Sequence, residues 1–198
     1  SLRIAATAES EEEAHRLIEP TARMIYERLG SLIFSEGDAE LQHVVAQLLE
    51  ARGLTLSTAE GCTGGAVAER LVAIPGASRW FRGGVVAYSN AAKDLLLDVP
   101  AELIESHGAV SREVAEAMAA ACRHKFSTDL AVATVGIAGP DGATADKPVG
   151  FFCVAVAGPG DTTSNRVTVW GDRETIQSRG AKHALNQVRL WLARNANV

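Results

Sequence analysis

The chain has 198 residues, of which 47% are hydrophobic and 22% are charged, and its formal net charge is −5. This length and composition fit a soluble globular protein with one domain of ordinary size and a short extension. No lysine or arginine cluster forms a basic stripe, and no apolar run approaches the ~20 residues of a membrane span, so we expect no nucleic-acid or membrane partner.

The beginning of the chain predicts a small βαβ module. Residues 1–8 (SLRIAATA) alternate apolar and small side chains, as a strand does. Apolar residues then recur at helical spacing through residues 9–30, and Pro20 is expected to kink or restart that helix. Residues 31–34 (SLIF) predict a second short strand. These patterns divide the chain into two parts, residues 1–35 and residues 36–198.

Helical and strand patterns alternate through the larger part. Helices are predicted over residues 39–53, 66–74, 91–97, 100–108, 111–126 and 172–195. Strands are predicted over residues 54–59, 83–89, 128–136, 149–158 and 165–171, with the last two as a hairpin. Side chains suited to cap helices are Thr63, Asn90, Ser111 and Asp172. Strands that alternate with helices predict a three-layer α/β fold.

Three polar loops follow predicted strands: residues 61–65 (GCTGG), 88–93 (YSNAAK) and 136–142 (GIAGPDG). Ligands bind to open α/β sheets where loops leave the carboxyl ends of the strands, so we expect these loops to form one pocket. A small-residue turn before a helix also suits an anion, because the helix start presents free N–H groups. Such a turn can instead hold a nucleophile.

Lys93 is the candidate general base. It falls in the first turn of a predicted helix, where the helix dipole disfavours a cation, and partial burial lowers the pKa of an amine further. The alternative is a solvated surface lysine. Tyr88 and Asn90 are two residues apart and point to one side of an extended chain, and Asn90 is a candidate for a helix cap, a ligand contact or both. Arg173 either reaches an anionic group or lies on the surface.

The cysteines Cys62, Cys122 and Cys153 form no CxxC pair and fit the reduced thiols of a cytoplasmic protein. No spacing of His, Cys, Asp and Glu indicates a metal site. Residues 61–65 lack the Lys-Ser/Thr pair of a P-loop and the three-glycine spacing of a dinucleotide fold. A generic phosphate-binding module is therefore the weaker alternative.

Several ordered motifs resemble the C-terminal domain of the CinA (competence/damage-inducible) family: TAEGCTGG, YSNAAK, HGAVS, VGIAGPDG, KPVG and GDRETIQ. The similarity covers residues 39–195, and residues 1–35 resemble the small linking module of longer members. It implies a three-layer α/β/α sandwich with a mixed, mostly parallel sheet, in a homodimer or higher homo-oligomer. It also implies hydrolysis of nicotinamide mononucleotide to nicotinate mononucleotide and ammonia, in pyridine-nucleotide salvage, without a metal or cofactor.

The family pattern for the first loop reads A-E-S-C-T-G-G, and its serine is the nucleophile. Gly61 occupies that position here, whereas the resemblance carries the activating lysine over to Lys93, with Tyr88 and Asn90 beside it. A second departure is Val135, where the family has Thr or Ser. The residues expected to contact the ligand are Cys62, Thr63, Gly64, Gly65, Asn90, Gly136, Ala138, Gly139 and Arg173.

The missing serine leaves three interpretations. The domain binds a nucleotide without amidase activity, or Lys93 and Tyr88 activate a water beside Gly61 and give weak hydrolysis, or Cys62 or Thr63 replaces the serine. The third is disfavoured, because neighbours in an extended segment point to opposite sides, so Cys62 should face away, and Thr63 should cap the helix. A rival of another class is a non-catalytic dimerisation module of a longer CinA-type protein.

Overall fold

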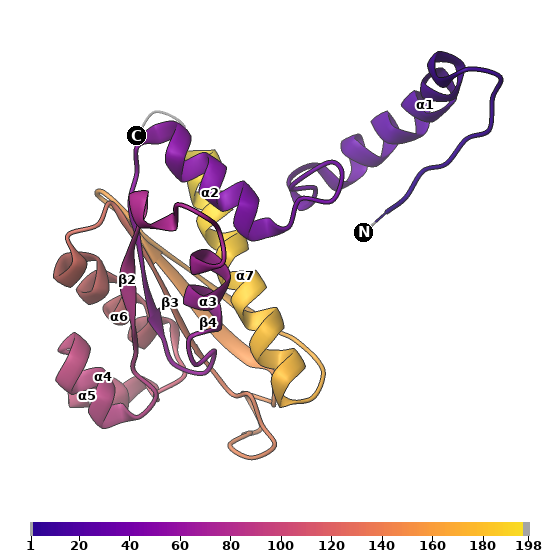
Figure 1. Ribbon diagram of the computed structural model, residues 1–198. Coiled ribbons are helices and arrows are strands. Elements are labelled where there is room, and N and C mark those ends of the chain that lie inside the picture. The colour runs from indigo at the N-terminus through magenta and orange to yellow at the C-terminus, as the bar shows by residue number, and fades with distance from the viewer. Residues whose placement is uncertain (1, 196–198) are drawn as a thin grey trace. The chain divides into compact units, whose positions relative to one another are not determined.

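The computed structural model describes residues 2–195, which form two compact units (Figure 1). The first unit is Ser1–Ala39 and the second is Glu40–Val198. All residues of the candidate pocket belong to the second unit, so the pocket can be described within that unit alone.

The first unit is built around helix α1 (Glu11–Leu29). Ser10 caps this helix, because its hydroxyl accepts a hydrogen bond from the Glu13 N–H at 3.2 Å. Three glutamates lie in the first turn, where the helix dipole favours negative charge. The helix continues through Pro20 rather than starting again there.

The two strands predicted in this unit are wrong. Residues 2–8 have no regular structure, and the second predicted strand is replaced by a short 3-10 helix, η1 (Gly30–Leu32), and irregular chain. A strand is stable only when another strand satisfies its backbone hydrogen bonds, and the described part of this unit contains none. Alternation of apolar residues alone therefore did not form a sheet.

The second unit contains a five-stranded sheet in the order β2–β1–β3–β4–β5. The strands are β1 (Leu56–Glu60), β2 (Phe81–Val86), β3 (Leu130–Gly136), β4 (Phe151–Ala157) and β5 (Thr162–Thr168). Strand β1 is parallel to β2 and β3, whereas β4 is antiparallel to β3 and β5. The mixed sheet and its terminal hairpin are confirmed, with parallel and antiparallel pairings equal in number.

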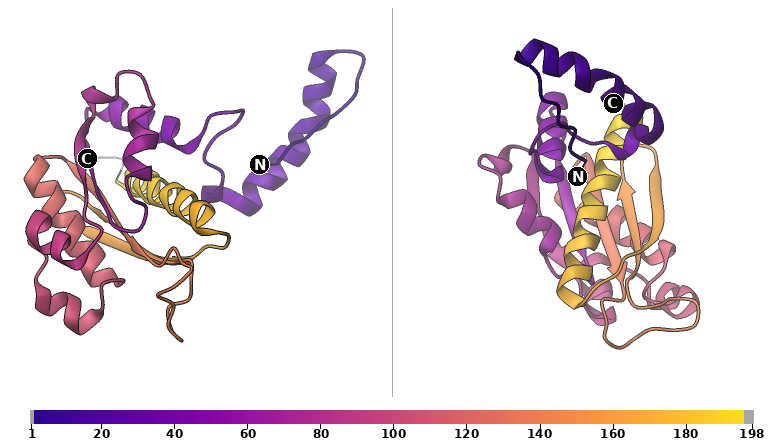
Figure 2. Two further views of the ribbon diagram at one scale, coloured as in Figure 1. Left: turned by 60° about the horizontal axis from the view of Figure 1, so that its bottom comes forward. Right: turned by 90° about the vertical axis from the view of Figure 1, so that its right-hand side faces the viewer.

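Helices cover both faces of the sheet and give the three expected layers (Figure 2). One face carries α2 (Leu41–Arg52), α3 (Ala66–Val72) and α7 (Arg173–Arg194). The other carries α4 (Asn90–Leu97), α5 (Ala101–His107) and α6 (Arg112–Phe126), while the short 3-10 helix η2 (Ala77–Arg79) precedes β2. Among the helices of residues 2–195, none has the length and apolarity that a bilayer crossing requires.

The two faces of the sheet are packed with side chains of different size. Under α6 the buried sheet residues are mostly alanines: Ala59, Ala131, Ala133, Ala155 and Ala157. Under α2 and α7 they are larger: Leu56, Leu130, Val132, Val154 and Val156. Small side chains let α6 lie close to the sheet, and the larger ones fill the space beneath the other helices. Both faces of β3 and β4 are buried, which explains their nearly continuous apolar sequence.

Candidate functional site

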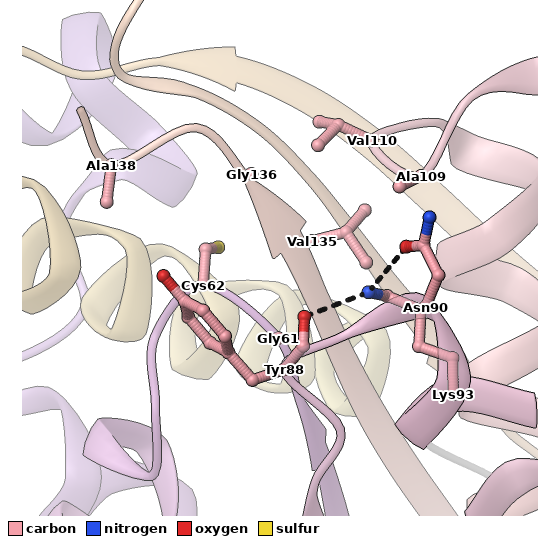
Figure 3. A pocket seen from close by; sticks show the side chains of 10 residues that line it. All are labelled: Gly61, Cys62, Tyr88, Asn90, Lys93, Ala109, Val110, Val135, Gly136 and Ala138. Atoms are coloured by element: carbon pink, nitrogen blue, oxygen red, sulfur yellow. Dashed lines mark hydrogen bonds between the residues drawn. The ribbon is translucent and has the colours of Figure 1, made fainter. Parts of the chain in front are cut away.

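A pocket of about 240 Å³ opens where the carboxyl ends of β1, β2 and β3 meet (Figure 3). Its wall comes from Gly61 and Cys62 after β1, Tyr88, Asn90 and Lys93 after β2, Val135, Gly136 and Ala138 around the end of β3, and Ala109 and Val110 before α6. The structure thus brings the three predicted loops together. The wall at Ala109 and Val110 was not predicted, although the HGAVS motif that contains it was a sequence signal.

Gly61 lies in the pocket wall directly after β1. Its N–H donates to the Thr134 carbonyl oxygen at 2.8 Å, so the pairing of β1 with β3 continues into the turn. A Cβ atom added here would lie 3.0 Å from that oxygen and 3.7 Å from Val135 Cγ1, and the backbone is not in the left-handed region. A serine therefore requires only a small shift of its neighbours, and the backbone does not demand glycine at this position.

Gly136 has the opposite character, because close packing requires glycine there. An added Cβ would lie 2.8 Å from both Cys62 Sγ and Phe152 Cδ1, and 2.9 Å from the Phe151 carbonyl oxygen. The absence of a side chain lets the end of β3 approach the turn after β1. Gly136 therefore shapes the pocket through its backbone.

Glu60 organises the turn between β1 and α3, although it was not among the predicted site residues. Its carboxylate is only 1% exposed and accepts hydrogen bonds from the N–H groups of Gly65, Val67 and Ala68 at 3.0, 3.0 and 2.8 Å. These N–H groups belong to the start of α3, so Glu60 caps that helix from the end of the preceding strand. The sequence signal was a carboxylate at the end of an apolar strand, just before the turn.

Thr63 does not cap α3, so that prediction is wrong. Its hydroxyl donates to Glu60 Oε2 at 2.7 Å and lies 2.7 Å from Thr134 Oγ1. The reason is that Glu60 already satisfies the N–H groups that Thr63 was expected to cap. Thr63, Gly64 and Gly65 all lie outside the pocket wall. The helix start that seemed suited to an anion is already occupied by the protein's own carboxylate.

Cys62 faces the pocket, so the prediction that it faces away is wrong. Residues 61–65 form a turn rather than an extended segment, and the alternation of side chains along a strand does not apply to them. Gln177 on α7 donates to the Cys62 carbonyl oxygen at 2.9 Å, which ties the turn to that helix. Burial raises the pKa of the Cys62 thiol, so the sulfur stays protonated at neutral pH.

Lys93 lies in the first turn of α4 and is only 4% exposed, which excludes the solvated alternative. Its Nζ donates to the Tyr88 carbonyl oxygen at 3.3 Å and to Asn90 Oδ1 at 3.5 Å (Figure 3). Neither acceptor carries a charge that would stabilise the ammonium form. Burial lowers the pKa of the Lys93 amine below its ordinary value. The amine is therefore shifted in the direction that suits a general base.

Ser89, rather than Asn90, caps α4. The Ser89 hydroxyl accepts a hydrogen bond from the Ala92 N–H at 3.1 Å, whereas Asn90 is the first residue of the helix. The predicted cap at Asn90 is wrong because its neighbour already has the extended backbone that this role requires. The Asn90 side chain instead faces the pocket, with its amide oxygen toward Lys93 (Figure 3). Its amide nitrogen remains a donor for other partners.

Arg173 begins α7 and adjoins the pocket. Its Nη2 donates to the Tyr88 hydroxyl at 2.7 Å, and its Nη1 donates to the Gly139 carbonyl oxygen at 2.6 Å. The guanidinium therefore joins the loop after β2 to the loop after β3, and it fixes Tyr88, a residue that is 58% exposed. A guanidinium has five donors, so Arg173 retains capacity for an anionic partner.

The pocket wall offers a candidate base, Lys93, but no hydroxyl nucleophile of the serine type. The ten residues of its wall include a buried amine, a phenol and an amide, but no serine or threonine hydroxyl. Within residues 2–195, no three His, Cys, Asp or Glu side chains gather in a way that could hold a metal ion. The pocket can accept a small polar group and take up a proton at Lys93.

Comparison with known proteins gave consistent matches. Residues 38–192 match the family model described as the CinA C-terminal domain. A CinA-like protein of Gemmatimonas aurantiaca is 44% identical over 195 residues, which cover 98% of this chain and 46% of that protein. The chain thus spans about half the length of the curated relatives it matches. The crystal structure of competence damage-inducible protein A from Klebsiella pneumoniae, 35% identical, matches with a TM-score of 0.76 and covers 78% of this chain and 96% of that chain.

Proposed function

The chain belongs to the CinA family through its C-terminal domain, and from that premise we propose that its pocket binds nicotinamide mononucleotide or a similar mononucleotide but hydrolyses its amide weakly or not at all. The reaction would convert nicotinamide mononucleotide and water to nicotinate mononucleotide and ammonia, a step of pyridine-nucleotide salvage. One observation carries the proposal: a buried lysine with a lowered pKa shares the pocket with a glycine at the position of the family's nucleophile.

The missing hydroxyl is the main argument against efficient hydrolysis. In the covalent route, a serine oxygen attacks the carboxamide carbon while a base takes its proton, and ammonia leaves from the resulting intermediate. Gly61 offers no oxygen for this attack. When one member of a cooperating catalytic group is removed, only positioning and electrostatic stabilisation remain, at a cost of several orders of magnitude.

A direct attack by water is the route that remains for weak activity. Lys93 Nζ would take a proton from the water, and the water oxygen would attack the carboxamide carbon and release ammonia. Val135 lies beside this space, with its Cγ1 3.7 Å from where a side chain at position 61 would begin, and it offers a methyl group where the family has a hydroxyl that could hold the water. This valine is a second reason to expect a low rate.

The cysteine route has less support, even though Cys62 faces the pocket. A thiol attacks an amide as the thiolate, and burial holds the pKa of Cys62 well above its usual range. Thr63 is a still weaker candidate, since its hydroxyl is engaged by Glu60 and Thr134 outside the pocket wall.

The test is ammonia release from nicotinamide mononucleotide by the unaltered chain, by Gly61→Ser and by the matched control Gly61→Ala. We expect much faster turnover from Gly61→Ser than from the unaltered chain or Gly61→Ala, with an acyl-enzyme detectable by mass spectrometry in Gly61→Ser alone. Brisk turnover by the unaltered chain that survives Lys93→Ala would refute the proposal. If Gly61→Ser gains nothing, Val135→Thr should be added to it, because Val135 is the other departure in the pocket.

A second candidate is a non-catalytic module that dimerises. It is favoured by two features: β2 is an edge strand with one neighbour and a 49% exposed Val86, and helix α4 carries the exposed apolar side chains Leu95 (79%) and Leu96 (40%). Calorimetry with nicotinamide mononucleotide and light scattering separate the two candidates. No heat from the ligand together with a stable dimer would favour the module, whereas ligand binding that depends on Lys93 would favour the pocket.

A further inference from the structure

Glu60 accepts more hydrogen bonds than a helix cap requires. Its buried carboxylate accepts four hydrogen bonds: one from the Thr63 hydroxyl and three from the N–H groups of Gly65, Val67 and Ala68. A buried carboxylate is costly unless its oxygens are satisfied, and here both oxygens are used. The arrangement is therefore a built feature of the fold rather than a chance contact.

The position of this cap differs from the usual one. The residue at the N-cap position of α3 is Gly65, whose φ of 105° lies in the left-handed region and which has no side chain to cap with. A serine or aspartate next to the helix would satisfy the first N–H groups locally. A cap from Glu60 instead joins the end of β1 to the start of α3. It thereby closes a ring of hydrogen bonds around residues 61–64, which include the Gly61 and Cys62 wall of the pocket.

The same network reaches the opposite strand. Thr63 Oγ1 lies 2.7 Å from Thr134 Oγ1, and the Gly61 N–H donates to the Thr134 carbonyl oxygen at 2.8 Å. Thr134 directly precedes Val135 and Gly136, which form another part of the pocket wall. A displacement of Glu60 would therefore be transmitted to both strands that hold the site.

The cap also decides where an anion can bind. Three N–H groups at the start of α3 are already taken, and a carboxylate at that place repels a second negative charge. A ligand phosphate is consequently excluded from this helix start. Arg173, at the other side of the mouth, is left as the group suited to an anion.

We propose that Glu60 is a positioning residue: it fixes the turn that carries Gly61 and Cys62 relative to Lys93, and it keeps anions away from the start of α3. The proposal rests on the proposed function only for its catalytic consequence. Its structural part, the fixed turn, can be tested without any ligand.

The ligand-free test is the rate at which iodoacetamide alkylates Cys62, followed by mass spectrometry. Cys62 is 7% exposed, so reaction requires the turn to open, and Cys122 and Cys153 serve as buried internal references. In Glu60→Gln the carboxamide cannot accept all four hydrogen bonds, and we expect alkylation of Cys62 to become at least about tenfold faster. A control that destabilises the fold away from the turn is Leu49→Ala, in the core between α2 and the sheet, for which the Cys62 rate should stay near that of the unaltered chain.

Thr63→Val keeps the three N–H bonds to Glu60 and cuts the link to Thr134, so it should give a smaller acceleration. It also supplies the test if Glu60→Gln does not fold. An unchanged Cys62 rate in both folded variants, or in Thr63→Val alone when the other is unfolded, would overturn the proposal. Equal acceleration in Leu49→Ala would do the same, because it would show general loosening rather than a role of Glu60.

The catalytic consequence is measured in the Gly61→Ser background. Adding Glu60→Gln should lower kcat for nicotinamide mononucleotide on the order of a hundredfold, while KM changes little, because a small misplacement of the nucleophile affects the reacting geometry more than binding. A rise in KM with kcat unchanged would overturn the positioning role. If Gly61→Ser stays inactive even with Val135→Thr added, the amidase part of the proposed function fails, and the alkylation rates still decide the role of Glu60.

Discussion

The turns after β1 and β2 have the same layout, a strand followed by a short turn and a helix, yet they are stabilised differently. The helix after β2 is capped locally by Ser89, and this leaves Asn90 and Lys93 free to face the pocket. The helix after β1 is capped by Glu60 from across the turn, and the turn presents Gly61 and Cys62. One turn thus carries the buried amine of Lys93, whereas the other is held in place but offers no hydroxyl.

This difference teaches that the structure of both turns is independent of a side chain at position 61. Having glycine rather than serine at position 61 removes no hydrogen bond that holds the turn, because the turn is fixed by Glu60, Thr63 and Thr134. Lys93 is equally independent of position 61, since its partners are Tyr88 and Asn90. The cleft therefore forms without a side chain at position 61.

The largest expected effect comes from removing the amine of Lys93, the candidate base. In the Gly61→Ser background, Lys93→Ala should lower the rate of ammonia release by roughly a hundredfold to ten-thousandfold, which is the usual contribution of a positioned base. Lys182→Ala, on an exposed position of α7, is the matched control and should leave the rate unchanged. An unchanged rate in Lys93→Ala would mean that the turn after β2 does not supply the base.

The pH dependence of Gly61→Ser sharpens the same point. Because Lys93 must be neutral to accept a proton, the rate should rise with pH through the pKa of Lys93 and then level off. Burial lowers that pKa, so the midpoint of the rise should lie below the ordinary lysine value of 10.5. A midpoint at or above pH 10.5 would show that Lys93 is not the titrating group.

A smaller effect, on ligand affinity, is expected from changing Arg173. Arg173→Ala should weaken the binding of nicotinamide mononucleotide by roughly tenfold to a hundredfold, since a charge-assisted hydrogen bond and the anchor of Tyr88 are lost together. Arg179→Ala is the control, because Arg179 lies on the same helix and donates to the Trp170 carbonyl oxygen rather than to the site. Titration calorimetry measures both, and equal affinities would remove Arg173 from the binding site.

The buried base should also cost stability. The unfolded state binds the lysine proton at a higher pH than the folded state, so stability falls as the pH drops from 10.5 through the lowered pKa of Lys93. Lys93→Met should therefore raise the free energy of unfolding at pH 7, and the gain should shrink as the pH approaches 10.5. Chemical denaturation at several pH values, with Lys182→Met as the control, tests this. A gain that does not depend on pH would contradict it.

The smallest effect concerns the local cap. Ser89→Ala should lower the free energy of unfolding by about 1 kcal/mol, the usual value for an N-cap, and leave alkylation of Cys62 unchanged. Thermal unfolding of Ser89→Ala beside Asn90→Ala provides the comparison, since Asn90 does not cap the helix. A larger loss for Asn90→Ala would contradict the assignment of the two turns.

Much of the fold of the second unit could be predicted because its helices and strands follow local sequence patterns, and each strand also has a neighbouring strand to pair with. The helix caps at Ser111 and Asp172 are confirmed, each accepting from an N–H three residues on. The predicted strands in the first unit failed for the complementary reason. Their residues alternate as strand residues do, but the described part of that unit offers no neighbouring strand.

The candidate site shows the same division. The convergence of the three loops followed from the rule that parallel strands place their carboxyl ends at one edge. The caps at Thr63 and Asn90 were mispredicted, because each depends on which of several nearby groups accepts from the helix N–H groups, and the direction of Cys62 was mispredicted because residues 61–65 form a turn rather than an extended segment. Only the folded chain shows that Glu60 and Ser89 reach those N–H groups.

The amino-acid sequence by itself determined the alternation of strands and helices, the family, and the absence of a hydroxyl at Gly61, because these reside in residue identity and spacing. The tertiary structure decided that Lys93 is buried, that Glu60 occupies the helix start, and that Arg173 holds Tyr88. These features depend on distances between segments far apart in the chain. Burial and hydrogen bonding are settled by the packing of those segments, which no local pattern specifies.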